Sequence, residues 1–416
     1  MRSVGSSTRI AIGRIHSGTV RLGCRSRRPW RPIWDDMAAR VVFVRSKSPA
    51  GMEPRVAKEA ATLARAGYEV HAVLWDRECA FPAEETRDGV RVHRYHLRAP
   101  EGQPDLIALL PRWWWYAFRR IASLRPQVVH AVDFDTILPA SASARLARAK
   151  LVYDIFDFYA EMVTADLSPR FREILAKGER RMIDRADLVI LPDLRRTVQF
   201  GRARPKRLVE IMNVPEDRAV PTGAEDPGHF VIFYGGMIAN DRGLVDLVVA
   251  CESTGARFIV AGHGPDEAAL LNTIETSPAS TYLGTIPYQE VLERTASCHA
   301  VAALYDPSVP NNRFAAPNKL FEAMMFSKPV LVSEGTAAAD IVREVGCGLV
   351  VRYGDREGLK RALESLMLSP ADSAAMGARG RRAFESRYNW NAMEPRLLDA
   401  YRDLLGTPDP PNRGRS

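Results

Sequence analysis

Short hydrophobic runs recur along the chain at regular intervals, separated by helical or polar sequence. In the first half, such runs predict strands at Arg40–Arg45, Tyr68–Trp75, Val90–His96, Gln127–Ala131, Leu151–Ile155 and Leu188–Leu191. Apolar positions on one face predict a helix over Pro54–Ala66, which Gly67 ends. Strands alternating with helices at this spacing indicate a mostly parallel sheet covered on both faces.

A second series with the same alternation follows. It predicts strands at Phe230–Tyr234, Arg257–Ala261, Thr281–Leu283, Ala300–Leu304, Pro329–Val332 and Gly348–Val351. Predicted helices between them are Leu244–Glu252, Pro265–Ile274, Tyr288–Ser297, Pro317–Phe326 and Ala337–Val345. Glu216–Gly228, rich in Pro, Gly and acidic residues, is typical of a linker. The α/β pattern therefore predicts two doubly wound Rossmann-like domains that face a cleft.

The predicted organisation has six parts. They are an extension at 1–36, a first domain at 37–215, a linker at 216–228, a second domain at 229–386, a closing helix at 387–408 and a tail at 409–416. Sheets of this type bind ligands at the carboxyl ends of their strands. The chemistry is therefore expected in the loops that follow the strands.

Two glycine loops follow strands of the second domain. Gly235-Gly236 ends one strand, Arg242-Gly243 opens the next helix, and Gly262-His263-Gly264 ends another strand. Glycines let a ligand approach the backbone, and a helix start presents free N–H groups to phosphate. A tight turn with a solvated arginine is the alternative for the first loop. Two such loops at one sheet edge favour a single ligand site.

A further motif lies after the strand Ala300–Leu304. The segment from Pro317 to Val330 reads P-N-K-L-F-E-A-M-M-F-S-K-P-V, with Lys319 and Glu322 three residues apart on one helix face. An ordinary surface ion pair is one interpretation. The other places Lys319 and the helix amides at phosphate, with Glu322 accepting hydrogen bonds from a ribose.

The order Gly-Gly, Arg-Gly, Gly-x-Gly-Pro and then P-N-K-L-F-E-A-M-x-x-x-K-P-V resembles the retaining glycosyltransferases of family 4, which have two Rossmann-like domains (the GT-B fold; glycosyl transferases group 1). The closing Tyr388-Asn389-Trp390 also resembles that family's C-terminal signature, whose last helix crosses back to the first domain. The resemblance covers about Arg40–Leu405. It implies a hexosyltransferase-like enzyme of polysaccharide biosynthesis, with a nucleotide-diphosphate sugar as donor and a glycan or lipid-linked acceptor.

The resemblance also assigns roles to the motif residues. Glu322 would bind the donor ribose, and Arg242 would take the place of a phosphate-binding lysine. The remaining donor-binding candidates are Asn318, Gly235, Gly236, Gly262 and Gly264. Arg242, Lys319 and helix dipoles would stabilise the departing diphosphate without a metal ion, so neither a metal nor a cofactor is expected.

Three positions depart from the family pattern. Phe314 stands where members often carry a glutamate that touches the donor sugar, Met237 replaces an arginine, and Phe156 replaces a histidine at the cleft. Asp306 or Asn312 is a candidate replacement for the missing glutamate contact. These changes leave open a nucleotide-sugar-binding subunit with little activity. A nucleotide-sugar epimerase of the same fold is a second alternative.

The first domain is expected to hold the acceptor. Asp157 is its catalytic candidate, and Arg55 and Asp133 are weaker acceptor candidates. Arg55 could instead form an exposed i,i+4 pair with Glu59. Asp133-Phe134-Asp135 spells D-x-D, a metal-binding pattern in other glycosyltransferases, but the donor motifs lie in the second domain. The sequence therefore predicts no metal site.

The formal net charge of +8 is concentrated at one end of the chain. Residues 1–34 contain eight arginines and no acidic residue. A mis-assigned start before Met37, a basic tail and a targeting segment all fit this composition. A nucleic-acid partner is not expected, because the basic charge is confined to this segment. The five scattered cysteines fit a reducing cytoplasm.

A cluster of aromatic and basic residues lies between two predicted strands of the first domain. Residues 111–120 read P-R-W-W-W-Y-A-F-R-R. Trp113, Trp114 and Trp115 with the arginines suit peripheral contact with the inner face of a membrane. The alternative is a helix that packs its aromatic residues onto the first domain.

Overall fold

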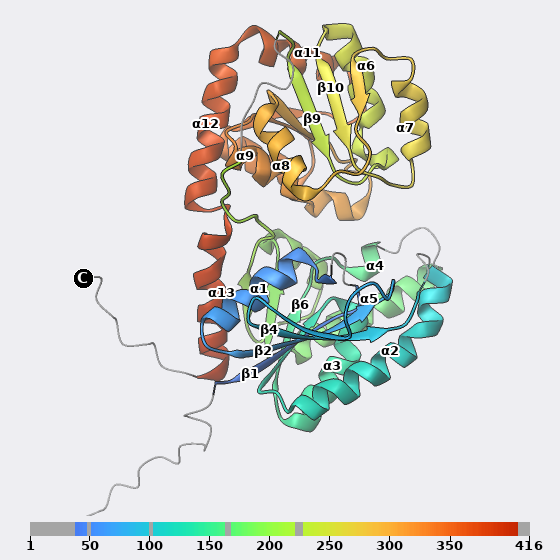
Figure 1. Ribbon diagram of the computed structural model, residues 1–416, viewed down its shortest axis with the longest axis vertical. Helices are drawn as coiled ribbons and strands as arrows, with labels where there is room; N and C mark the ends of the chain where they lie inside the picture. Colours follow the sequence, from blue (N-terminus) through green and yellow to red (C-terminus); the bar gives the residue numbers. More distant parts are fainter. Residues whose placement is uncertain (1–37, 48–50, 100–102, 163–167, 221–227, 407–416) are drawn as a thin grey trace, which may run out of the picture. The chain divides into compact units, whose positions relative to one another are not determined.

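The computed structural model describes residues 38–47, 51–99, 103–162, 168–220 and 228–406 (Figure 1). The predicted basic extension, the tail and part of the linker lie outside these ranges. Two sheets are present, in the strand orders β3-β4-β2-β1-β5-β6-β7-β8 and β11-β10-β9-β12-β13-β14. Every strand pair is parallel except β3 with β4. The predicted fold class is confirmed.

The first sheet and its helices span the first half of the chain. The strands are β1 Arg40–Arg45, β2 Glu69–Asp76, β3 Glu84–Arg87, β4 Val90–His96, β5 Val128–Val132, β6 Lys150–Asp154, β7 Leu188–Leu191 and β8 Leu208–Glu210. The helices are α1 Pro54–Arg65, α2 Gln103–Leu124, α3 Phe134–Ala147, α4 Tyr159–Met162, α5 Pro169–Arg185 and the 3-10 helix η2 Leu194–Phe200.

The second sheet and the closing helices follow. The strands are β9 Val231–Gly235, β10 Arg257–Ala261, β11 Ser280–Tyr282, β12 Ala300–Ala303, β13 Val330–Ser333 and β14 Gly348–Val351. The helices are η3 Asn240–Arg242, α6 Leu244–Thr254, α7 Glu267–Ile274, α8 Tyr288–Ser297, η4 Pro310–Phe314, α9 Asn318–Met325, α10 Ala337–Val345, α11 Arg356–Leu368, α12 Pro370–Ser386 and α13 Trp390–Leu405.

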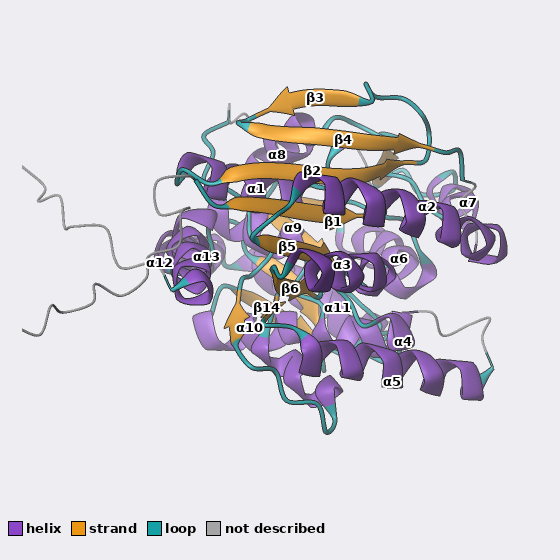
Figure 2. Ribbon diagram, turned by 90° about the horizontal axis from the view of Figure 1, so that it is seen from below, coloured by secondary structure: helices purple, strands orange, loops and turns teal. Residues whose placement is uncertain are grey.

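Apolar side chains cover both faces of the first sheet. On one face, Val56, Ala60 and Leu63 of α1 pack against Val41 and Phe43 of β1. On the other, α2, α3 and α5 cover the sheet, and α2 and α3 lie side by side (Figure 2). Strands buried on both faces read as continuous hydrophobic runs, which is why the sequence located them within about two residues.

Two strands were not predicted. β3 has the sequence Glu-Glu-Thr-Arg, contains no apolar residue and forms an antiparallel edge with β4. β8 is only three residues long. Neither offers the hydrophobic run or alternation on which a strand prediction depends.

The final helix returns to the first domain, as predicted. Trp390 Nε1 donates to Thr62 Oγ1 of α1 at 3.0 Å, and the Tyr401 hydroxyl lies 2.6 Å from His130 Nδ1 of β5. Helix α12 packs on α9 of the second domain, whereas α13 contacts α1 and β8 (Figure 1). The two consecutive helices therefore join the two sheets.

The aromatic cluster is largely part of the core. Trp113 is fully buried and stacks on Trp75, with ring centres 5.8 Å apart. Trp114 Nε1 donates to the Asp135 carbonyl at 2.7 Å, and Trp115 is 61% exposed. Membrane contact through Trp113 is therefore wrong, because this side chain packs onto the sheet. No described helix is both long and apolar enough to cross a bilayer.

Candidate functional site

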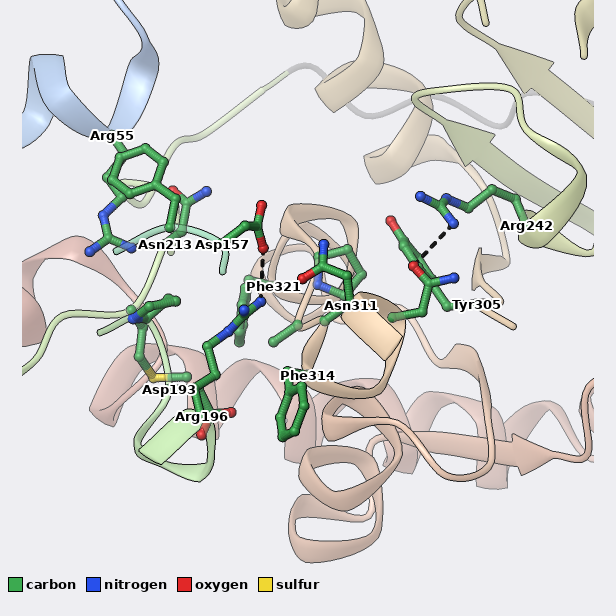
Figure 3. Close-up of a pocket in the computed structure, with 17 residues that line it drawn as sticks. Arg55, Asp157, Asp193, Arg196, Asn213, Arg242, Tyr305, Asn311, Phe314 and Phe321 are labelled. Carbon is green, nitrogen blue, oxygen red and sulfur yellow. Dashed lines mark hydrogen bonds and ion pairs between the residues drawn. The ribbon is translucent and has the colours of Figure 1, made fainter. Parts of the chain in front are cut away.

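A cavity of 240 Å³ lies between loops of the two sheets (Figure 3). The first domain lines it with Arg55, Phe156, Asp157, Pro192, Asp193, Arg196, Met212 and Asn213. The second domain lines it with Arg242, Tyr305, Asn311, Asn312, Phe314, Ala315, Ala316, Pro317 and Phe321. Phe156, Pro192 and Tyr305 each follow the carboxyl end of a strand, where a doubly wound sheet binds ligands.

Arg242 stands at this cavity on the 3-10 turn before α6. It is buried, and its guanidinium stacks on Tyr305 at 4.1 Å from the ring centre. Its Nη1 pairs with Asp241 and donates to Asn312 Oδ1 at 3.3 Å. The alternative of a solvated arginine in a simple turn is therefore wrong. These contacts hold the cation beside the start of α9.

Lys319 is the second residue of α9 and is 8% exposed. Its Nζ lies 3.5 Å from the centre of the Tyr234 ring and 5.7 Å from that of Tyr305. Burial and the nearby Arg242 lower the pKa of Lys319 to about 7, although Glu322 opposes the shift. A buried amine held against aromatic rings is a cation that an anionic ligand would stabilise.

Glu322 lies one helical turn further along α9 and is 4% exposed. The Tyr288 hydroxyl donates to its Oε1 at 2.9 Å. Burial raises the pKa of Glu322, and the Tyr288 hydrogen bond and the Lys319 charge counteract this. The surface ion pair between Lys319 and Glu322 is therefore wrong, because both side chains are buried. Neither residue lines the 240 Å³ cavity; Asn318 does not line it either.

The glycines bring two loops into contact. A Cβ on Gly262 would lie 1.8 Å from the Gly236 carbonyl oxygen, and one on Gly264 would lie 2.0 Å from the Ile238 oxygen. The Gly236 amide donates to the Ala261 oxygen at 2.9 Å. Close packing of the two loops thus accounts for Gly262 and Gly264. A Cβ on Gly236 would approach Lys319 Nζ at 3.1 Å, whereas Gly235 packs against Val291 and Phe233.

Asp157 faces the cavity from the first domain. Its Oδ1 accepts from Arg196 Nη2 at 3.0 Å, and burial raises its pKa, opposed mainly by Arg196. This carboxylate follows β6, opposite the residues that the second domain contributes. The structure thus brings Asp157 and Arg242, predicted from distant parts of the sequence, to one cavity.

Arg55 also reaches the cavity, with its guanidinium 4.5 Å from the centre of the Phe156 ring. The predicted pair with Glu59 exists, at 3.0 Å between Nε and Oε1, but it is buried rather than exposed. Arg55 Nη2 also contacts Asp154 Oδ1 at 2.7 Å. Arg55 is thus fixed by two carboxylates behind the cavity wall.

Those carboxylates belong to a buried cluster with His130. A carboxylate oxygen of Glu59, a carboxylate oxygen of Asp154 and a ring nitrogen of His130 lie within 4.8 Å of one another. Burial raises the pKa of Glu59 and of Asp154 to about 7 and lowers that of His130 to about 4. Arg55 and Tyr401 bond the outer atoms of the cluster, whereas Glu59 Oε2, His130 Nε2 and Asp154 Oδ2 face one another without a hydrogen-bond partner among the described residues. We interpret it as structural.

Comparison with known proteins assigns the fold to a family. Residues 50–212 match the model for the glycosyl transferase 4-like domain, and residues 228–369 match that for glycosyl transferases group 1. The chain belongs to the family 4 glycosyltransferases of the GT-B fold. This agrees with the family expected from the motifs.

Individual relatives of the chain are distant. A Corynebacterium glutamicum GDP-mannose-dependent monoacylated alpha-(1-6)-phosphatidylinositol monomannoside mannosyltransferase is 28% identical over 149 residues, which is 35% of this chain and only 38% of that protein. Sucrose-phosphate synthase from Thermosynechococcus elongatus superposes with a TM-score of 0.71 at 15% identity, covering 89% of this chain and all of the other. Anabaena HepE, solved in complex with UDP-glucose, gives 0.64 at 15% identity, covering 88% of this chain and 99% of HepE.

Asp133 does not line the cavity. Its carboxylate pairs with Arg45, and Oδ1 accepts from the Phe156 amide at 2.9 Å. Asp135 is buried and accepts from Ser46. The two aspartates of the D-x-D motif therefore engage different protein groups, and Asp133 orients the turn that carries Asp157.

The three residues that depart from the family pattern, Phe314, Phe156 and Met237, have different surroundings. Phe314 lines the cavity, the Phe156 ring contacts the guanidinium groups of Arg45 and Arg55, and Met237 is exposed. Of the two suggested replacements for the missing glutamate, Asn312 lines the cavity and Asp306 does not. Asn312 Nδ2 donates to Asp241 at 2.8 Å, so this side chain also positions the Arg242 loop.

Sequence reasoning missed several polar residues of the site, among them Arg196, Asn311 and Tyr288. Arg196 and Asn311 line the cavity, and Tyr288 holds Glu322. Arg196 follows β7, so the rule that ligands bind at strand ends was a usable signal for it. Asn311 and Tyr288 lie on a 3-10 turn and at a helix start, where no periodic pattern marks them.

Proposed function

We propose that the protein transfers a hexosyl group from a nucleotide-diphosphate sugar to a glycan or lipid-linked acceptor, with retention at the anomeric carbon and without a metal ion. The observation that carries this proposal is a pair of buried cations, Arg242 on the turn before α6 and Lys319 at the start of α9, beside a cavity shared by both domains. The nucleotide sugars named for the relatives, GDP-mannose and UDP-glucose, support a donor of this class.

In the proposed donor complex, Arg242, Lys319 and the first amides of α9 bind the diphosphate. Glu322 accepts hydrogen bonds from the ribose, with Asn318 and the glycine loops around it. A helix N-terminus adds a positive partial charge to those of the two side chains. Charge that develops on the leaving diphosphate thus meets fixed cations, the role that a metal ion has in other transferases.

The transfer itself breaks the bond between the anomeric carbon and the phosphate oxygen and forms one to an acceptor hydroxyl. The acceptor attacks on the face of the leaving group, and its proton passes to the departing phosphate oxygen. Asp157 orients the acceptor from the first domain, and Arg55 and Asp133 support its loop from behind. Holding the reactants in this geometry supplies much of the rate enhancement.

A lipid-linked acceptor would bring the protein to the inner face of a membrane. The support for such contact is limited to Trp115, the exposed member of the three tryptophans, with Arg119 over its ring at 5.8 Å. This part of the proposal is separable from the donor site, because α2 lies away from Arg242 and Lys319 in the sequence and does not line the cavity.

Calorimetry with UDP-, GDP- and ADP-sugars in the presence of EDTA tests the donor site. We expect one nucleotide class to bind the wild type and to lose affinity in Glu322→Ala, with a smaller loss in Glu322→Gln, which keeps one ribose acceptor. NMR of the product's anomeric proton tests retention. Binding without turnover would favour the alternative of a non-catalytic subunit, and absence of binding by all three classes would contradict the donor site.

A further inference from the structure

Arg196 is a buried cation for which the site described above provides no complete set of partners. Its side chain is 5% exposed, and Nη2 donates to Asp157 Oδ1 at 3.0 Å. The other two guanidinium nitrogens, Nε and Nη1, have no hydrogen-bond partner among the described residues. An arginine stays charged at any physiological pH, so these donors require an acceptor from elsewhere.

The surroundings of Arg196 indicate where that acceptor lies. The guanidinium is 5.8 Å from the centre of the Phe314 ring, so a first-domain cation lies against a second-domain residue. Asn311 lines the same cavity, and its Oδ1 is also buried without a partner. In the view of Figure 3, Arg196 lies between Arg242 on one side and Arg55 on the other.

This position corresponds to the sugar of the proposed donor. With the diphosphate at Arg242 and Lys319, the sugar extends across the cavity towards the first domain, where Asp157 and Arg196 lie. Phe314 offers it an apolar ring and no acceptor for hydroxyl groups. Beside the carboxylates of Asp157 and Asp193, the polar group at this position with donors still unpaired among the described residues is the Arg196 guanidinium, which forms its best hydrogen bonds with an oxyanion.

We propose that the transferred sugar carries a carboxylate, as in a uronic acid, and that Arg196 is the residue that selects it. The inference rests on the proposed function, because it assumes a nucleotide-diphosphate sugar bound at Arg242 and Lys319. A neutral hexose would leave the guanidinium paired with Asp157 alone. A carboxylate gives it a second anion and a charge-assisted hydrogen bond.

Matched donor pairs test the proposal. UDP-glucuronate differs from UDP-glucose, and GDP-mannuronate from GDP-mannose, only in a carboxylate at C6. In the wild type, for the base that the protein accepts, we expect the acidic sugar to bind about tenfold or more tightly than its neutral counterpart. Equal affinity for the two members of the pair would overturn the proposal while leaving the donor site in place.

Variants then assign the preference to Arg196. We expect Arg196→Met to abolish it and to leave the affinities for free UDP or GDP and for the neutral sugar within about twofold of the wild type, because only the acidic sugar exploits the charge. Arg196→Lys should restore part of it, since a lysine supplies charge without the planar fork. The matched control is Arg195→Met on the same turn, because Arg195 pairs with Asp193 and Asp340 and does not line the cavity.

Two other outcomes would overturn the assignment. Weaker binding of the free nucleotide by Arg196→Met would mean that Arg196 binds the diphosphate. Unchanged donor affinities with a raised KM for an anionic acceptor would place the second anion on the acceptor. Thermal unfolding shows whether the Arg196→Met variant is folded. If it is not, the preference of the wild type for the acidic sugar within each matched pair still tests whether the transferred sugar carries a carboxylate. Absence of binding by every nucleotide sugar would instead refute the proposed function.

Discussion

Each domain buries a cation next to the cavity, but the two are compensated in opposite ways. In the first domain Arg55, 1% exposed, is held by Glu59 and Asp154 at 3.0 and 2.7 Å. Although burial alone would lower its pKa, the two carboxylates raise it. In the second domain Lys319 is also buried, at 8% exposed, has no carboxylate in ion-pair contact among the described residues, and has a lowered pKa.

This difference in acidic partners distinguishes a buried cation with a structural role from one that binds a ligand. A buried cation with two acidic partners is complete without a ligand, and removal of either side leaves an uncompensated charge. A buried cation against aromatic rings is incomplete, and its perturbed pKa marks it as a functional-site candidate. Arg55 should therefore matter first for folding, and Lys319 first for donor binding and turnover.

The largest effect is expected for Arg55→Met. The substitution leaves Glu59 and Asp154 buried beside each other without their cation, so the free energy of unfolding should fall by about 3–5 kcal/mol. Urea denaturation followed by circular dichroism measures it. Arg65→Met on the same helix is the control, because the pair of Arg65 with Glu394 is exposed and should contribute only about 0–1 kcal/mol. Similar losses in both variants would contradict the distinction.

Lys319→Met should show the opposite profile. We expect kcat/KM to fall about 100- to 1,000-fold, as for loss of one preorganised group that stabilises transition-state charge. The free energy of unfolding should stay equal or rise, because a buried amine is replaced by an apolar side chain of similar length. Turnover and denaturation of the same preparation test both halves. A variant that loses stability in step with activity would make Lys319 a structural residue.

The pH dependence of donor binding is a further test that Lys319 binds the donor. The pKa of Lys319 is about 7 in the free protein, and a bound diphosphate raises it, so binding takes up a proton. Affinity should be greatest below pH 7 and fall by up to about tenfold per pH unit above it, until the pKa of the complex is reached. Calorimetry with UDP or GDP from pH 6 to 9 measures this. Lys319→Arg, which stays charged, should flatten the profile.

Lys319 also affects stability, with a sign opposite to that for binding. Its pKa in the folded protein lies below the ordinary value of 10.5, so the unfolded chain binds more protons between pH 7 and 10.5. Stability should therefore rise with pH across this window, and Lys319→Met should remove that contribution. The test is to measure the free energy of unfolding against pH for the wild type and for Lys319→Met and to compare the two slopes.

The sequence was sufficient for the architecture and for part of the site. Strands buried on both faces give unbroken apolar runs, and the motif around Glu322 is specific enough to locate the donor side. It was insufficient for the buried cluster, because Glu59, His130 and Asp154 are 71 and 24 residues apart and meet only when β5 and β6 pair beneath α1. Burial itself, which decides between a surface ion pair and a functional cation at Lys319, depends on tertiary packing.

Arg196 is a site residue that was not predicted from the sequence. It lies on a 3-10 turn beside Arg195, and no local pattern distinguishes the two arginines. In the structure Arg195 pairs with Asp193 and Asp340, whereas Arg196 turns into the cavity. The direction of a side chain on an irregular turn follows from tertiary contacts, here with Asp157 and Phe314, which sequence spacing does not encode.

The smallest effect is expected at Tyr288, which links Glu322 to the start of α8. Tyr288→Phe removes the hydroxyl that donates to Glu322 Oε1, so the carboxylate loses an anchor but no charge. Donor affinity should weaken by about 1 kcal/mol, the net value of one hydrogen bond. Without this donor, the carboxyl of Glu322 should also keep its proton to a higher pH, since the hydrogen bond lowers its pKa. The loss in affinity should therefore be larger at pH 5.5 than at pH 8, and an identical loss at both would show that Tyr288 contributes only packing.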